Sequence, residues 1–85
     1  MIYRETAIPG ALQITPEPVH DERGYFCRIF DAEEFRVRGL NADVCQSSVS
    51  YNTSAGTLRG MHYQLPPAAE TKFIRATSGG VHDVI

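Results

Sequence analysis

The chain has 85 residues, of which 42% are hydrophobic and 21% are charged. This is ordinary globular composition, and it argues against a disordered, collagen-like or low-complexity protein. The net charge of −2 comes from 8 basic and 10 acidic residues, so it gives no general attraction to nucleic acid or to an anionic membrane. No apolar run approaches the roughly 18 residues of a membrane span, and the first residues lack the pattern of a secretory signal, so we expect a cytoplasmic protein.

Turn residues punctuate the chain at short intervals and leave runs of strand length between them. Many short strands joined by turns are typical of a sandwich or barrel, and no repeat or linker divides the chain, so we expect one all-β domain over residues 1–85. A chain this short buries only about 60% of the surface that its unfolded form exposes, which makes oligomerisation or strand exchange a way to complete the core. The predicted strands cover residues 2–7, 11–15, 25–30, 44–51, 57–64, 71–77 and 81–85.

One segment, residues 31–38, breaks this pattern and is typical of a short helix. Asp31 is suited to cap its first turn, and Glu34 occupies the capping-box position three residues later. Phe30 and Phe35 fall at the two positions of a hydrophobic staple. Gly39 can supply the left-handed residue that stops the helix. We therefore predict a structural helix anchored to the end of the preceding strand.

The densest polar cluster lies in residues 56–64, which read Gly-Thr-Leu-Arg-Gly-Met-His-Tyr-Gln. Gly60 within an extended segment indicates a bulge or a close approach of backbone or ligand. Arg59 fits either a surface ion pair or a contact with a phosphate. His62 fits either a hydrogen-bonded structural residue or a catalytic imidazole. The pattern alone leaves these alternatives open.

Lys72 has apolar neighbours on its predicted strand face, which fits either an edge-strand residue that opposes aggregation or a partly desolvated functional amine. His62, Gln64 and Glu70 lie near a plausible spacing for metal ligands. A stable transition-metal site needs at least three good donors, and a glutamine is a poor one. We therefore predict that the chain holds no metal.

Several motifs occur in order along the chain: Asp-Glu-Arg-Gly-Tyr-Phe at 21–26, Gln46, Val49-Ser50, the string at 56–64, Pro66-Pro67, Glu70, Lys72, Gly80 and Asp83-Val84. This series resembles the dTDP-4-dehydrorhamnose 3,5-epimerase family of nucleotide-sugar enzymes over the whole chain. The resemblance implies a double-stranded β-helix, the cupin jelly roll, in a homodimer that exchanges N-terminal strands. It also implies a dTDP-4-keto-6-deoxy sugar as substrate, inversion of the carbons beside its ketone on the way to L-rhamnose or a related deoxysugar, and no cofactor.

The resemblance assigns roles to individual residues. His62 matches the family's base, which removes a proton next to the C4 ketone, a role that an imidazole can fill. Lys72 matches a residue near the sugar oxygen and would stabilise the enolate, so both side chains are expected in a sheltered pocket. The common family pattern has Asn at the position of Ser48, which weakens one expected substrate contact. The matched substrate-binding positions are Arg23, Phe26, Gln46, Ser48 and Arg59.

Family members are about twice as long as this chain, whose size suits one small domain. The resemblance places the family's general acid, a Tyr, and the Asp that orients the catalytic His in the half that is missing here. We therefore expect an N-terminal portion of an epimerase-type jelly roll, with His62 as base. The alternative is a non-catalytic half-cupin that serves as a binding or assembly module. A weaker third interpretation is an unrelated small β domain in which His62 and Lys72 are structural.

Overall fold

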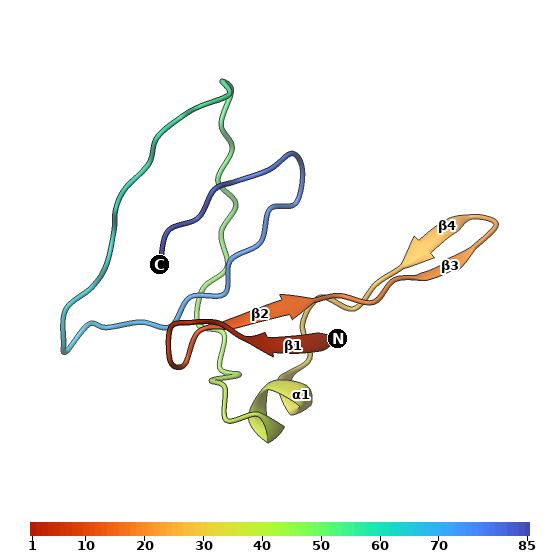
Figure 1. The fold of residues 1–85 in the computed structure, drawn as a ribbon, viewed down its shortest axis with the longest axis horizontal. Helices are drawn as coiled ribbons and strands as arrows, with labels where there is room; N and C mark the ends of the chain where they lie inside the picture. Colours follow the sequence, from red (N-terminus) through yellow and green to blue (C-terminus); the bar gives the residue numbers. More distant parts are fainter. The chain divides into compact units, whose positions relative to one another are not determined.

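The computed structural model describes all residues from Met1 to Ile85, in two compact units, Met1–Val44 and Cys45–Ile85. All the regular structure lies in the first unit (Figure 1). It consists of four short strands in two antiparallel sheets, followed by one helix, so the expected all-β class with a helix near residues 31–38 is confirmed. The elements are β1 (Ile2–Glu5), β2 (Leu12–Thr15), β3 (Val19–Asp21), β4 (Gly24–Phe26) and α1 (Ala32–Val37).

The first sheet is the β1–β2 hairpin, which pairs Tyr3 with Ile14 and Glu5 with Leu12. Its loop closes through Thr6, whose N–H donates to the Ala11 carbonyl over 3.2 Å. Gly10 takes a φ of 84° in this loop, a conformation that glycine adopts without steric cost. Both strands were predicted, although each is shorter than its predicted range. Tyr3 and Ile14 are half-buried on one face, which directs this face toward the helix-bearing part of the unit.

The second sheet is the β3–β4 hairpin, in which His20 pairs with Tyr25. Asp21 forms its turn, because its carboxylate accepts from the Arg23 backbone N–H over 2.9 Å and from the Arg23 guanidinium over 2.6 Å. Strand β4 ends at Phe26, earlier than the predicted 25–30, and β3 was not predicted at all. Every residue of this hairpin is exposed in the structure. A strand that buries neither face needs no alternation of apolar and polar residues, so the sequence gives no periodic signal for β3.

Helix α1 has the predicted termini. Asp31 is its N-cap, and one carboxylate oxygen accepts from the backbone N–H groups of Glu33 and Glu34 over 3.0 and 3.1 Å. Gly39, with a φ of 71°, donates to the Arg36 carbonyl, and Leu40 donates to the Phe35 carbonyl. These two bonds form a Schellman motif, which satisfies carbonyls that the helix end leaves unpaired.

Phe35 is the single buried residue, with 5% of its surface exposed. Its ring lies 4.9 Å from that of Phe30, which confirms the predicted staple, and 6.2 Å from that of Tyr3. The Arg38 guanidinium lies 3.9 Å above the Tyr3 ring as a cation–π contact. The core of this unit is therefore one phenylalanine enclosed by the helix, β1 and the chain before the helix.

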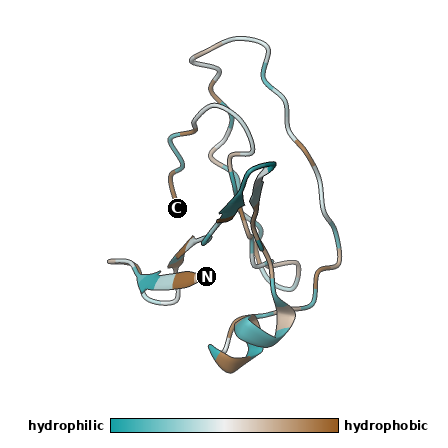
Figure 2. Ribbon diagram, turned by 90° about the vertical axis from the view of Figure 1, so that its right-hand side faces the viewer, coloured by the Kyte–Doolittle hydropathy of each residue, from teal (hydrophilic) through white to brown (hydrophobic).

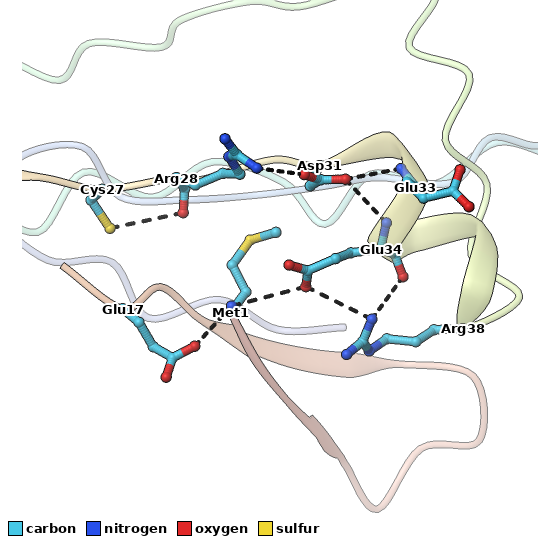
Figure 3. A network of polar contacts seen from close by, with 8 residues as sticks. All are labelled: Met1, Glu17, Cys27, Arg28, Asp31, Glu33, Glu34 and Arg38. Atoms are coloured by element: carbon cyan, nitrogen blue, oxygen red, sulfur yellow. Dashed lines mark hydrogen bonds and ion pairs between the residues drawn. The ribbon is translucent and has the colours of Figure 1, made fainter. Parts of the chain in front are cut away.

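Ion pairs join the start of the chain to the segment after β2 and to helix α1 (Figure 3). The Met1 ammonium lies 2.8 Å from the Glu17 carboxylate and 3.9 Å from that of Glu34. Hydrogen bonding to Glu17 raises the pKa of this amine. Glu34 is also paired with Arg38 over 3.7 Å, so one helical carboxylate links the start of the chain to the last turn of α1.

In the second unit, Cys45–Ile85, the chain is irregular and forms no helix or strand. The strands predicted at residues 44–51, 57–64, 71–77 and 81–85 are therefore wrong as regular elements. The turns between them are present near residues 53–56, 66–68 and 77–79. An extended segment becomes a stable strand only when neighbouring strands satisfy its backbone and an apolar layer covers one face, and every residue of this unit is exposed.

Hydrophobic residues are scattered along the ribbon in short stretches among hydrophilic ones (Figure 2). Large apolar side chains remain open to solvent in both units, including Phe26 at 70% and Leu58 at 90% exposure. No helix of the structure combines the length and the apolarity that crossing a membrane requires.

We predict that Phe35→Ala destabilises the first unit by about 3 kcal/mol, because it removes the only buried ring and leaves a cavity. Urea unfolding followed by tyrosine fluorescence would measure this loss. The control is Val37→Ala on the same helix, where Val37 is 75% exposed and the expected change is within about 0.5 kcal/mol. Equal effects of the two substitutions would show that Phe35 does not hold the unit together.

Acid should loosen the first turn of α1. The backbone N–H of Glu34, and then Arg28 and the N–H of Glu33, lower the pKa of Asp31, so the ionised cap stabilises the helix above the ordinary aspartate range. This contribution is lost as the pH falls through the lowered pKa. We expect the amide protons of Glu33 and Glu34 to exchange faster in NMR below that pH, and Asp31→Ala to show fast exchange already at neutral pH. Asp21→Asn, in the separate β3–β4 turn, should leave both amides protected.

Candidate active site

The segment that carries His62 begins after a tight turn at residues 53–56. Gly56 has a φ of 74° in this turn, and the Thr57 hydroxyl donates to the Ser54 carbonyl over 2.7 Å. These local contacts define where residues 57–64 leave the turn, and that stretch forms no helix or strand. This stretch contains the polar cluster of residues 56–64, which therefore begins at the end of the turn.

Gly60 lies directly against the His62 imidazole. A Cβ placed on Gly60 would stand 3.0 Å from His62 Nδ1 and 3.3 Å from the His62 backbone nitrogen. Gly60 also has a φ of 93°, which residues with a side chain rarely adopt. The close approach expected at Gly60 is therefore present, and it involves the ring of the predicted base. The structure leaves His62 exposed, so the sheltered pocket expected around it is not formed by these residues.

Lys72 is paired with Glu70, whose carboxylate lies 3.5 Å from the ammonium. The two side chains are 42% and 49% exposed, so the Lys72 amine is not desolvated here. An ion pair this open to water contributes little to stability and exchanges easily for another anion. The structure thus pairs Lys72 with a carboxylate and does not bring it together with the other predicted site residues.

Arg59 is held by two oxygen atoms from the start of its own loop. Its Nε donates to Asn52 Oδ1 over 2.6 Å, and its Nη2 donates to the Tyr51 carbonyl over 3.2 Å. Sequence reasoning missed Asn52, because an asparagine that precedes a turn is ordinary turn chemistry. Only its spacing of seven residues from Arg59 across a glycine-containing turn could have suggested this contact.

The other predicted substrate contacts are spread over both units. Arg23 is at the β3–β4 turn, where its guanidinium lies 2.6 Å from the Asp21 carboxylate and chiefly accounts for the lowered pKa of Asp21. Phe26 ends the same hairpin and is 70% exposed. Gln46 and Ser48 lie exposed in the irregular stretch that follows Cys45. Their roles as substrate contacts stay predictions.

No group of three or more His, Cys, Asp or Glu side chains is arranged to hold a metal ion. The first unit contains a hollow of about 770 Å³ between the β1–β2 loop and the end of α1. Tyr3, Arg38 and Leu40 contribute to its wall, and none of the predicted site residues does. The predicted site residues are therefore not part of this hollow.

Comparison with known proteins identifies one family. The family model described as dTDP-4-dehydrorhamnose 3,5-epimerase matches residues 5–85. Proteins of that name from Mycobacterium tuberculosis and Shigella flexneri are each 40% identical to the chain, over 100% and 94% of its length. The one from Sinorhizobium fredii is 34% identical over 99% of the chain. The chain spans only 42%, 44% and 43% of these relatives, respectively, and no solved structure matches it.

We predict that Gly60→Ala displaces the His62 ring, because the new methyl group would stand 3.0 Å from Nδ1. NMR of the imidazole nitrogens and carbon-bound protons should show shifted His62 signals. The control is Gly79→Ala, since Gly79 also has a left-handed φ of 69° but nothing within 4 Å of the added methyl group. His62 signals that stay unchanged in Gly60→Ala would contradict the close packing of ring and backbone.

Proposed function

The chain belongs to the dTDP-4-dehydrorhamnose 3,5-epimerase family, and from this premise we propose that it forms the proton-abstracting part of such an isomerase. The proposed reaction inverts C3, C5 or both in a dTDP-4-keto-6-deoxy sugar. The observation that carries the proposal is the family match over residues 5–85, which includes the complete string around His62. The antiparallel hairpins and single short helix are an incomplete all-β, cupin-like fragment of that family.

The proposed chemistry follows from the acidity of a carbon next to a ketone. Its proton is only weakly acidic, so its removal requires a base and a stabilised enolate. His62 is proposed as the base, and its packing against Gly60 limits the directions in which the ring can point. Lys72 is proposed to stabilise the enolate oxygen, for which it would exchange its exposed contact with Glu70. Neither step needs a cofactor.

The remaining predicted contacts are proposed to hold the nucleotide sugar. Arg59 suits an oxygen of the sugar or the diphosphate, because a guanidinium presents several N–H donors in one plane. The hairpin residues Arg23 and Phe26 are exposed and carry a charge and an aromatic face that a nucleotide can use. Gln46 and Ser48 supply neutral polar groups on the second unit. Cytoplasmic location stays the expectation for this enzyme.

We also propose that the chain is the N-terminal portion of one jelly-roll domain that works as a homodimer with exchanged N-terminal strands. The support is physical. Only Phe35 is buried, while many large apolar side chains in the hairpins and in the irregular second unit are open to solvent. Apolar surface of this extent is stabilised when further strands cover it, from the same domain or from a partner.

The alternative function is a non-catalytic half-cupin that binds a dTDP nucleotide or assembles with another chain. The observation that favours it is the exposure of His62 and Lys72, since proton abstraction from carbon works best in a site that excludes water. Under this alternative the chain binds the same class of ligand, a dTDP nucleotide, but does not catalyse the epimerisation.

Solvent deuterium exchange at C3 and C5 of a dTDP-4-keto-6-deoxy sugar tests the proposal. We expect the verified 85-residue chain to promote exchange and His62→Ala to lower its rate by about 10²- to 10⁴-fold, the usual contribution of a general base. His82→Ala is the matched control and should leave the rate unchanged. Equal exchange by the unsubstituted chain and His62→Ala would remove His62 from its role. Nucleotide binding without any exchange would support the alternative.

A further inference from the structure

Arg59 differs from the other arginines whose side-chain contacts are defined in the structure. Each of the others lies within ion-pair distance of a carboxylate, whereas Arg59 contacts two neutral oxygen atoms. Its partners are the Asn52 side-chain amide and the Tyr51 backbone carbonyl. The ion pairs are Arg23–Asp21, Arg28–Asp31, Arg36–Glu33 and Arg38–Glu34. Neutral acceptors orient the guanidinium of Arg59 but leave its positive charge uncompensated.

The two contacts of Arg59 use one edge of its guanidinium. A guanidinium has five N–H donors, one on Nε and two on each terminal nitrogen. Nε and Nη2 are the nitrogens bound to the loop oxygens, so the side edge of the fork is occupied by the protein itself. Three donors remain: one N–H of Nη1 and one of Nη2 run parallel and form the end edge, and the second N–H of Nη1 points toward the Cδ side. Two parallel donors at one edge are the arrangement that binds an oxyanion in a bidentate manner.

The loop that contains Asn52 is built to bring it back to Arg59. Residues 53–56 turn the chain, with a left-handed Gly56 and a hydrogen bond from Thr57 to Ser54 that closes the turn. Asn52 precedes this turn and Arg59 follows it, so an interaction across seven residues becomes short. An aspartate at position 52 would make the same contact but would neutralise the cation, which an asparagine does not.

We propose that Asn52 is a positioning residue that fixes the side edge of Arg59 and thereby presents its end edge to the diphosphate of the nucleotide sugar. This inference rests on the proposed function for the identity of the ligand, a nucleoside diphosphate. To that function it adds the residue Asn52 and the orientation of the Arg59 guanidinium. It directs Arg59 to an oxyanion and explains why neutral groups hold this arginine.

Three variants of the full chain test the proposal, with dTDP and thymidine as calorimetric probes at low salt. Asn52→Ala should weaken dTDP binding by about fivefold, the effect of one lost hydrogen bond, and should leave thymidine binding unchanged because thymidine has no phosphate. Asn52→Asp should also weaken dTDP binding, while NMR shows the Arg59 Nε–H still protected from exchange. Asn41→Ala, at an exposed asparagine whose side chain accepts from the Asp43 backbone, is the control and should bind both ligands normally.

The outcomes separate the inference from the function on which it rests. Equal dTDP affinity of Asn52→Ala and the unsubstituted chain would overturn the positioning role, and so would an equal loss of dTDP and thymidine binding, which indicates a structural defect. Failure of the unsubstituted chain to bind either dTDP or inorganic pyrophosphate would overturn the inference as well. Pyrophosphate binding that requires Asn52, without dTDP binding, would support the inference and contradict the nucleotide-sugar function.

Discussion

Burial of the Phe35 ring is the interaction on which the ordered part of the molecule depends. The helix brings this ring to Phe30, and the first hairpin supplies Tyr3 on another side. Burying one large aromatic side chain contributes about 1.5–3 kcal/mol, which is a large share of what a unit of this size can gain. The cap at Asp31 and the Schellman end at Gly39 set the length of the helix, and this length places Phe35 where both neighbours reach it.

The second unit is organised by different means. Its residues are exposed, so apolar burial holds none of them in place. Order comes from local hydrogen bonds and from backbone conformation: the turn at residues 53–56, the Arg59 contacts with the start of the loop, and the packing of the His62 ring on Gly60. Each of these arrangements involves residues close together in sequence. The chemically important groups are therefore placed by short-range geometry, and their surroundings depend on whatever covers this segment.

The sequence predicted best what is local. The helix, its cap, its staple and its glycine stop follow from residue types at fixed spacing, and the Gly60 approach followed from a glycine in an extended run. The absence of strands beyond residue 43 could not be predicted, because alternation shows what a segment can form and not whether a partner strand is present. β3 was missed because its residues are exposed on both faces. Asn52 was missed because a hydrogen bond between side chains leaves no periodic signal. The roles predicted for the site residues, from Arg23 to Lys72, rest on family membership and not on the geometry of these side chains in the structure.

The β3–β4 hairpin has a consequence for how the protein behaves in solution. A ribbon of two strands has two open edges, and this one carries Val19, Tyr25 and Phe26 at about 70% exposure each. Unpaired edges with apolar side chains accept additional strands from neighbouring molecules. Concentrated preparations will thus tend toward edge-to-edge self-association, which the charged tip of the hairpin, Asp21, Glu22 and Arg23, opposes. Dilute handling and solubilising charges beside Phe26 favour a homogeneous sample.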